Sequence, residues 1–222
     1  MTIAGQILYE DNHLIALNKL PGQIVQGDKT GDVCLADEVK AFLKERDAKP
    51  GNVFCGVIHR LDRPVSGVVL FAKTGKALSR MNAMVKDRSF KKQYRALVKN
   101  MPPQSEGHLE DYLVRNEKQN KSYVVDSKER TGAKLAVLDY RLIGTTQGGY
   151  HRLEIDLHTG RHHQIRCQPA HMGCPVKGDL KYGAQRSNPD GSISLHAYQV
   201  EFDHPVRREP VVVTAPEPWP TD

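Results

Sequence analysis

Several features that define common classes of protein are missing from this sequence. No run of apolar residues is long enough to span a bilayer, which argues against a helical membrane protein. The N-terminal segment MTIAGQILYE lacks the charged start, the apolar stretch and the small-residue cleavage site of a secretory signal. We therefore expect a cytoplasmic protein that makes no use of a membrane.

Cysteine is scarce and is not arranged for disulfides or for zinc. No Cys-x-x-Cys pair occurs among Cys34, Cys55, Cys167 and Cys174. These thiols are expected to be reduced and packed as small apolar groups. An alternative metal site would combine two of them with nearby histidines, as Cys167, Cys174, His162, His163 and His171. This spacing matches no standard zinc pattern, so no metal is expected.

Charge of one sign does not dominate the composition either. The 222 residues include 32 Lys and Arg against 26 Asp and Glu, a net charge of +6 that favours polyanions such as nucleic acids without requiring them. With 39% apolar residues, the chain can bury a sizeable core. No internal repeat, low-complexity segment or linker divides it. We therefore expect one domain over residues 1–222, in which the proline-rich residues 215–222 form a tail.

Three segments have the apolar periodicity of helices. GDVCLADEVKAFLKER predicts an amphipathic helix over residues 33–47, with Asp32 as its N-terminal cap. In GKALSRMNAMVKD the apolar residues share one helical face, and methionines such as Met81 are expected in the core. HHQIRCQPAHMG predicts a short helix that ends at Gly173, with Pro169 as a kink or a first-turn residue.

Most of the remaining sequence predicts β-strands, because short β-rich runs alternate with turn residues. GVVLFAK, an uninterrupted run at residues 67–73, is expected to be a buried strand. Residues 100–133 are expected to form a polar excursion within the domain. The other predicted strands lie in ILYEDNHLIALNK, KKQYRALVK, KSYVVDS, AKLAVLDYRLIG, YHRLEIDLHTG, SISLHAYQVEF and EPVVVTAP. The expected fold class is therefore α+β, with a mixed, mainly antiparallel sheet flanked by helices.

The stretch VIHRLDRPVSGVVLFAKT, residues 57–74, places the carboxylate of Asp62 between basic residues and just before an apolar strand. Two interpretations stay open from the residues alone. Asp62 either caps a turn or pairs with Arg60 or Arg63, or it is a catalytic nucleophile that a basic partner keeps ionised. A carboxylate can attack the anomeric carbon of a sugar, as in retaining glycosidases. That chemistry also requires a cation, a group that handles the base, and a site for a polyanion.

Two other segments supply candidates for these roles. TGRHHQIRCQ contains Arg161 and Arg166, and a guanidinium is the natural bidentate partner of a buried carboxylate. KKQYRALV contains Tyr94, whose ring can stack on a base and whose hydroxyl can transfer a proton. Lys91 and Lys92 beside it are expected to contact phosphates. Each of these residues, taken alone, also has an ordinary structural interpretation.

Taken together and in this order, four segments resemble the RluA family of pseudouridine synthases, which isomerise uridine in structured RNA. They are HRLDRPVSGVVLFAK, KKQYRALV, TGRHHQIRCQPAHMGCPVKGDLKYG and LHAYQVEFDHP. The resemblance extends from about Leu8 to Thr214. It implies the pseudouridine synthase fold, a stem-loop of transfer RNA or ribosomal RNA as substrate, and no metal or organic cofactor.

The family resemblance implies a role for each residue that matches a motif. Asp62 matches the aspartate that attacks the target nucleotide, and Arg166 matches the arginine that forms an ion pair with it. Tyr94 matches the tyrosine that stacks on the uracil and serves in proton transfer at C5. Ile165 is expected to line the uracil pocket, and Arg60 to enter the RNA stack where the target base has left it.

Three positions depart from the family pattern. Val65 stands where threonine is usual, Pro169 replaces an apolar helix residue, and His162 replaces the serine or threonine that precedes His-Gln. The imidazole of His162 is expected either to contact phosphate or to be an alternative first-turn residue. Arg161 is expected to bind RNA as well. None of the departures falls on the three expected catalytic residues, so an active enzyme is expected.

Two other functions stay open at this stage. One is an RNA-binding module of the same fold without activity, and the other is a hydrolase that cleaves a glycosidic bond. A hydrolase normally needs a second carboxylate or a metal, and Asp179 in KGDLKYG is expected to be a turn residue. Because the motifs begin close to Met1, RNA recognition is expected to reside in the catalytic domain, without the N-terminal RNA-binding domain of many relatives. The protein is expected to be a monomer.

Overall fold

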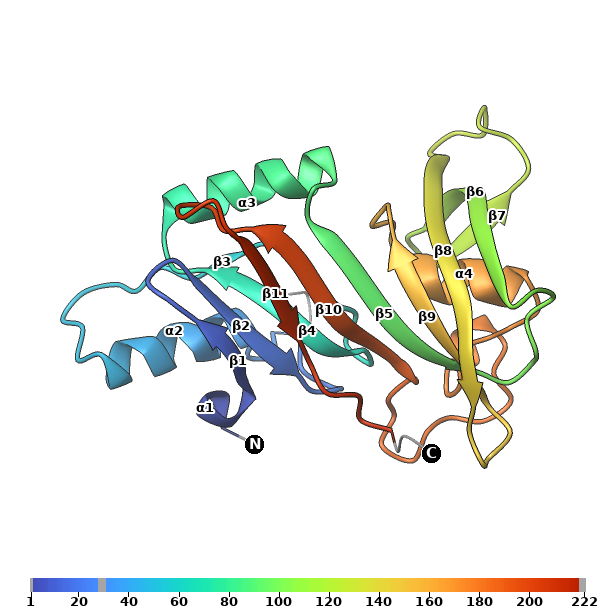
Figure 1. Ribbon diagram of the computed structural model, residues 1–222, viewed down its shortest axis with the longest axis horizontal. Coiled ribbons are helices and arrows are strands. Elements are labelled where there is room, and N and C mark those ends of the chain that lie inside the picture. Colours follow the sequence, from blue (N-terminus) through green and yellow to red (C-terminus); the bar gives the residue numbers. More distant parts are fainter. Residues whose placement is uncertain (1, 28–30, 220–222) are drawn as a thin grey trace. The chain divides into compact units, whose positions relative to one another are not determined.

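The computed structural model describes residues 2–27 and 31–219 (Figure 1). By its internal contacts the chain forms two compact units. The first comprises Met1–Lys91 and Ala197–Pro216, and the second comprises Lys92–His196 and Glu217–Asp222. The single domain over residues 1–222 stays a prediction. Within the described ranges, none of the helices is long and apolar enough to cross a membrane.

The first unit is built on β-strands that pair antiparallel, β1 with β2, β2 and β3 with β4, and β10 with β11. All seven residues of β4 are buried, as the uninterrupted apolar run predicts for a strand covered on both faces. The strands are β1 (Ile7–Glu10), β2 (Leu14–Lys19), β3 (Gly56–Val57), β4 (Ser66–Ala72), β10 (Leu195–Asp203) and β11 (Pro210–Thr214). The helices are α1 (Ile3–Gln6), α2 (Leu35–Arg46) and α3 (Gly75–Asp87).

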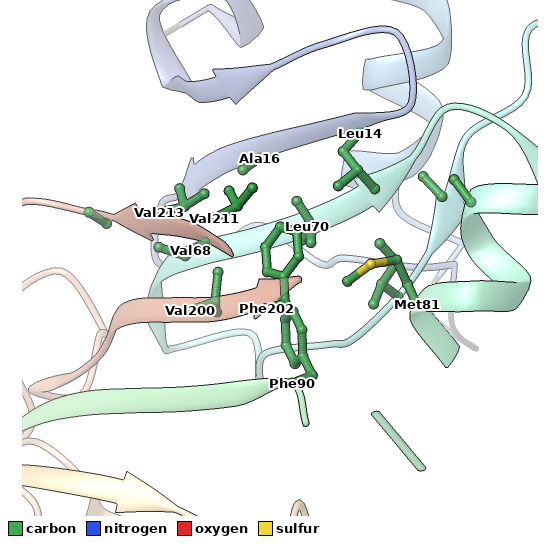
Figure 2. Packing of buried hydrophobic residues seen from close by; sticks show 14 residues of the cluster. Leu14, Ala16, Val68, Leu70, Met81, Phe90, Val200, Phe202, Val211 and Val213 are labelled. Carbon is green, nitrogen blue, oxygen red and sulfur yellow. The ribbon is translucent and has the colours of Figure 1, made fainter. Parts of the chain in front are cut away.

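Alternate residues of β2 and β4 join one apolar cluster with α3 (Figure 2). Leu14 and Leu70 pack there with Met81, which is fully buried. The expectation that the methionines of this helix belong to the core is thus confirmed for Met81. The helix begins after Thr74, whose hydroxyl accepts a hydrogen bond from the amide of Ala77 at 3.2 Å.

The start of α2 differs from the sequence-based expectation. The helix begins at Leu35 and its N-cap is Cys34, so the prediction that Asp32 caps a helix from residue 33 was wrong. The carboxylate of Asp32 forms an ion pair with Arg63 at 2.6 Å instead. A partner this far away in the sequence competes for the carboxylate, and spacing along the chain does not reveal it.

The second unit is an antiparallel sheet in the order β5-β9-β8-β6-β7 with α4 packed against it. A cluster of buried side chains forms the core between α4 and the sheet, and it consists of Leu113, Ala136, Cys167 and Tyr182. The strands are β5 (Lys91–Val98), β6 (Glu106–Asn116), β7 (Lys121–Val125), β8 (Lys134–Thr145) and β9 (His151–Leu157). The helical segments are α4 (Gln164–His171) and a short 3₁₀ helix, η1 (Leu180–Tyr182).

The end of α4 confirms one expectation and corrects another. Gly173 follows the C-cap of α4 with φ +89°, which is the left-handed conformation that favours glycine. Pro169 lies inside α4, so its alternative placement in the first turn was wrong.

Residues 100–133 are not merely a polar excursion, because they contain the 11-residue strand β6. Its residues 106–113 pair with β8, and its residues 112–116 pair with β7. Only Leu113 in β6 is buried, so its apolar signal is weak. Backbone pairing on both sides, rather than side-chain burial, holds β6 in the sheet. The resulting fold is α+β and mainly antiparallel, as predicted.

Two residues of the expected tail are held in place. Ala215 is fully buried and donates its backbone N–H to the carbonyl of Tyr198 at 2.9 Å. In the second unit, Glu217 accepts hydrogen bonds from Arg95 at 3.2 Å and from Arg152 at 2.6 Å. The chain is therefore anchored at least as far as Glu217.

Candidate active site

Asp62 lies in the loop that joins β3 to β4 in the first unit. Its carbonyl accepts a hydrogen bond from the amide of Val65 at 3.0 Å, which closes a tight turn. Val65 itself is buried, so the position where the family has threonine packs as part of the core. The carboxylate of Asp62 is half-buried. The turn therefore presents Asp62 from a fixed backbone directly before the buried strand.

The buried side chain of Lys19 also holds this turn in place. Lys19, at the end of β2, is fully buried, and its ammonium donates hydrogen bonds to the carbonyls of Arg63 at 3.1 Å and Val65 at 2.6 Å. A third bond goes to the carbonyl of Leu20 at 3.1 Å. Burial lowers the pKa of Lys19 to about 7, although the negative charge of Asp62 acts in the opposite sense. Asp62 is therefore close enough for its charge to favour the protonated form of Lys19.

Two further contacts fix the loop. The ring of His59 accepts a hydrogen bond from the amide of Leu70 in β4 at 3.2 Å. Gly67 has φ +114°, and a Cβ there would lie 2.2 Å from the carbonyl oxygen of Ala197. Only glycine allows this close approach of the two backbones. The stretch on both sides of Asp62 is consequently rigid.

The basic residues beside Asp62 have different environments. Arg60 is exposed, as a residue that enters an RNA stack must be. Arg63 forms its ion pair with Asp32. The interpretation of Asp62 as a turn residue is therefore correct for its backbone, and it does not exclude a catalytic role for its carboxylate.

In the second unit, Arg166 projects from α4 and forms a buried ion pair with Asp179. Its Nε donates to Oδ2 of Asp179 at 2.6 Å and its Nη2 donates to Oδ1 at 2.9 Å. The two side chains are only 7% and 1% exposed. The turn residue Asp179 is therefore also a bidentate partner of the expected catalytic arginine.

His163 lies on the other side of the Arg166 guanidinium. Its Nε2 is 3.0 Å from Nη1 of Arg166, and its Nδ1 is 2.9 Å from the hydroxyl of Tyr182. Burial and then the charge of Arg166 lower the pKa of His163 to about 2. The imidazole is therefore neutral and accepts a hydrogen bond from the arginine.

The loop that leads into α4 is held by side chains of the neighbouring strands. Arg161 donates from Nε to the carbonyl of Leu135 at 2.7 Å. His162 contacts Ser122 Oγ at 2.8 Å and Asn120 Oδ1 at 3.0 Å through its two ring nitrogens. Its ring stacks on that of His163, with the centroids 3.7 Å apart. His162 thus connects this loop to the hairpin between β6 and β7.

The remaining expected site residues of the second unit lie on β5 and α4. Tyr94 is 7% exposed and is paired in register with Ile155 of β9. Ile165 is buried in the first turn of α4. Lys92 is half-buried, and burial lowers its pKa. Lys91, which belongs to the first unit, is exposed and pairs with Glu201 at 2.8 Å.

The structure brings the expected residues together in two groups. Asp62 and Arg60 share one loop of the first unit, and Arg166 and Ile165 share α4 of the second. The ion pair between Asp62 and Arg166 stays a prediction from the family resemblance. Sequence reasoning missed Lys19, although a lysine at the end of the apolar strand LIALNK signals an unusual buried charge. It also missed the pairing role of Asp179, for which no local signal exists.

The described residues contain no group of three or more His, Cys, Asp or Glu side chains that could hold a metal ion. All four cysteines are buried, as expected for small apolar groups. The thiol of Cys167 donates a hydrogen bond to the carbonyl of Ser122 at 3.3 Å. The histidines of the alternative zinc site, His162 and His163, have the partners described above.

Comparison with known proteins identifies the family of this chain. The family model described as RNA pseudouridylate synthase matches residues 13–171. Ribosomal large subunit pseudouridine synthase D of Xylella fastidiosa is 34% identical over 96% of this chain and 66% of its own length. Ribosomal large subunit pseudouridine synthase C of Buchnera aphidicola is 30% identical over 96% of this chain and 68% of its own length. The chain therefore belongs to the RNA pseudouridylate synthase family.

An uncharacterized RNA pseudouridine synthase of Synechocystis is 32% identical, and the match covers 96% of this chain but 65% of that protein. The chain thus spans about two thirds of the length of these relatives. Among solved structures, human RNA pseudouridylate synthase domain containing 4 matches with a TM-score of 0.81 at 22% identity, over 97% of this chain and 90% of its own. This similarity shows that the chain has the pseudouridine synthase fold.

Proposed function

We propose that this protein isomerises a uridine to pseudouridine in structured RNA, with Asp62 as the catalytic carboxylate. The observation that supports the proposal most directly is the construction of the Asp62 loop. Lys19 holds the carbonyls on both sides of Pro64, and the glycine at position 67 fixes the strand that follows. A backbone held in this way gives the Asp62 carboxylate a defined starting point, which catalysis by a positioned group requires.

The reaction rearranges one nucleotide without net addition or loss of atoms. The N-glycosidic bond of uridine breaks, the uracil rotates, and its C5 forms a C–C bond to the ribose C1′. C5 then loses its proton, and the N1 that has left the sugar gains one. Asp62 either attacks the ribose carbon or first removes a ribose proton. Tyr94 stacks on the uracil and serves in the proton transfer at C5, and Ile165 lines the pocket. No metal or organic cofactor takes part in this scheme.

The proposal requires Asp62 of the first unit and Tyr94 and Arg166 of the second to serve the same nucleotide within one catalytic domain. Arg166 then forms an ion pair with Asp62 and keeps it ionised. Arg60 fills the stack that the flipped nucleotide leaves, which offsets part of the unstacking cost of a few kcal/mol. Four further side chains are assigned to contact the RNA around the target nucleotide, namely Arg161, His162, Lys91 and Lys92.

The substrate class is a stem-loop of ribosomal RNA or of transfer RNA. The relatives named ribosomal large subunit pseudouridine synthases favour ribosomal RNA as the first pool to test. The net charge of +6 supports a polyanionic substrate. We propose further that the enzyme acts in the cytoplasm as a monomer.

The test is tritium release from RNA labelled at uridine C5, with ribosomal and transfer RNA from cells that lack the gene. Wild type is compared with Asp62→Asn and with Asp87→Asn. Asp87 is a matched control, because its exposed carboxylate only caps Ser89 in the same unit. We expect release by wild type and by the control variant, and none by Asp62→Asn. Binding without release would indicate an inactive RNA-binding module, and free uracil would indicate a hydrolase.

A further inference from the structure

The ion pair between Arg166 and Asp179 fixes the plane of the guanidinium. Its two hydrogen bonds, at 2.6 and 2.9 Å, run from Nε and Nη2 to the two oxygens of one carboxylate. A bidentate contact of this kind leaves little freedom for rotation, unlike a single point contact. Both side chains are almost completely buried, so solvent does not weaken the pair.

Asp179 is itself placed by a well-defined turn. Its amide donates to the carbonyl of Val176 at 3.0 Å, and its carbonyl accepts from the amide of Tyr182 at 3.1 Å. Gly178, directly before it, has φ +87°, and a Cβ there would lie 2.8 Å from the carbonyl oxygen of Ser192. The backbone that carries the Asp179 carboxylate therefore has a fixed position.

A third bond holds the guanidinium at its other end. His163 accepts from Nη1 of Arg166, which requires the ring proton to be on Nδ1, facing the Tyr182 hydroxyl. That hydroxyl also accepts the backbone N–H of Ser122 at 2.8 Å. Arg166 is thus fixed through His163 to Tyr182 and to strand β7.

These three bonds occupy the Nε–H, one N–H of Nη1 and one N–H of Nη2. In the proposed function this guanidinium keeps Asp62 ionised, so its orientation affects the chemical step. Arg166 stays charged without Asp179, so loss of the Asp179 carboxylate changes the orientation of the guanidinium rather than its charge.

We propose that Asp179, together with His163, is a positioning residue of the reaction, and that it acts by holding the Arg166 guanidinium in the orientation that the chemical step requires. This inference rests on the proposed function. It predicts that loss of the Asp179 carboxylate affects the chemical step and leaves binding of RNA nearly unchanged.

The test compares wild type with Asp179→Asn and Asp179→Glu in steady-state tritium release from RNA. The matched control is Asp139→Asn, because Asp139 is an ion-paired aspartate of the same unit that contacts His108 and His158. We expect Asp179→Asn to lower kcat about 100-fold, the usual cost of a misplaced catalytic group, with KM within about threefold. Asp179→Glu recovers part of the loss, and the control variant matches wild type.

A second readout follows Arg166 directly, by the NMR resonance of its Nε–H. In wild type this proton is expected to exchange slowly, and in Asp179→Asn the protected resonance is lost. A folded Asp179→Asn variant with wild-type kcat overturns the inference. If this variant does not fold, His163→Phe decides, because it removes the bond to Arg166 and the bond to Tyr182 but leaves the ion pair with Asp179 in place. Unchanged kcat in folded His163→Phe overturns the inference, and a reduced kcat with unchanged KM supports it.

Failure of the proposed function gives a different result. Wild type then releases no tritium from any RNA pool, whereas the Arg166 resonance still reports the ion pair. An active wild type with an equally active Asp179→Asn variant overturns only the positioning role.

Discussion

The ammonium of Lys19 lies 2.6 Å from the carbonyl oxygen of Val65, at the end of the turn that carries Asp62. A fully buried lysine is rare, because removing the charge from water is costly. Here three backbone carbonyls take the place of water around the ammonium. The lysine thereby connects the end of β2 to the loop of the expected catalytic carboxylate.

Replacing this lysine is expected to impair both stability and activity. Lys19→Met keeps the length of the side chain but removes a donor that three backbone carbonyls share, so we expect a loss of about 3 kcal/mol in free energy of unfolding. Tritium release is expected to fall because the Asp62 turn loosens. Urea unfolding measures the first effect, and Lys40→Met, on the exposed Lys40, is the control. Unaltered stability and activity would show that Lys19 does not support the turn of Asp62.

Gly67 provides a second test of the same loop. Gly67→Ala places a Cβ 2.2 Å from the backbone of Ala197 at φ +114°, so we expect a loss of about 3 kcal/mol. Gly75→Ala is the matched control, because Gly75 begins α3 with open space around it. Alanine favours the helix, so the control is expected to unfold at the same temperature as wild type or higher. Equal melting temperatures for the two variants would contradict this account.

The fold class was predictable because each segment carries its own signal. The apolar run of β4 and the helical period of α3 are visible in single stretches of sequence. The strand β6 was missed, because it is held by backbone pairing on both sides and buries only Leu113. A strand with so few buried side chains shows no clear alternation.

The residues of the candidate site could be predicted where they belong to a sequence motif. The contacts between residues that are distant in the sequence could not. Asp62, Tyr94 and Arg166 were assigned by their motifs, and their catalytic roles stay predictions. The partnership of Arg166 with Asp179 depends on a turn that returns to α4, and the role of Lys19 depends on the pairing of β2 with β4. Asp32 was wrongly assigned as a helix cap for the same reason, because its ion pair with Arg63 joins residues that are distant in the sequence. Spacing along the chain does not encode such contacts.

His162 is expected to act mainly within the second unit. Its two ring nitrogens contact Ser122 and Asn120, so His162→Ala is expected to lower stability by about 1 kcal/mol. The amides of the β6–β7 turn should then exchange faster with solvent. His171→Ala, at an exposed histidine of the same unit, is the control. The salt dependence of RNA binding is measured as well, and a slope reduced by about 1 would show that His162 contacts phosphate.

Asp11 gives the first unit a defined sensitivity to acid. Burial raises its pKa, but hydrogen bonds from Tyr9, the amides of His13 and Leu14, and His204 outweigh burial and lower the pKa from 3.8 to about 2. The folded state therefore favours the carboxylate more than the unfolded state does, which stabilises the fold above pH 3.8.

This contribution is lost as the pH falls from 3.8 towards 2. We expect Asp11→Asn to be less stable than wild type by about 1–2 kcal/mol at neutral pH, and the difference to shrink towards zero in acid. Chemical unfolding of both proteins across this pH range measures the difference. Asp87→Asn is the control, because that exposed carboxylate is not held by a buried histidine. A difference between wild type and Asp11→Asn that does not change with pH would mean that the side chain acts by its shape alone, and not through its charge.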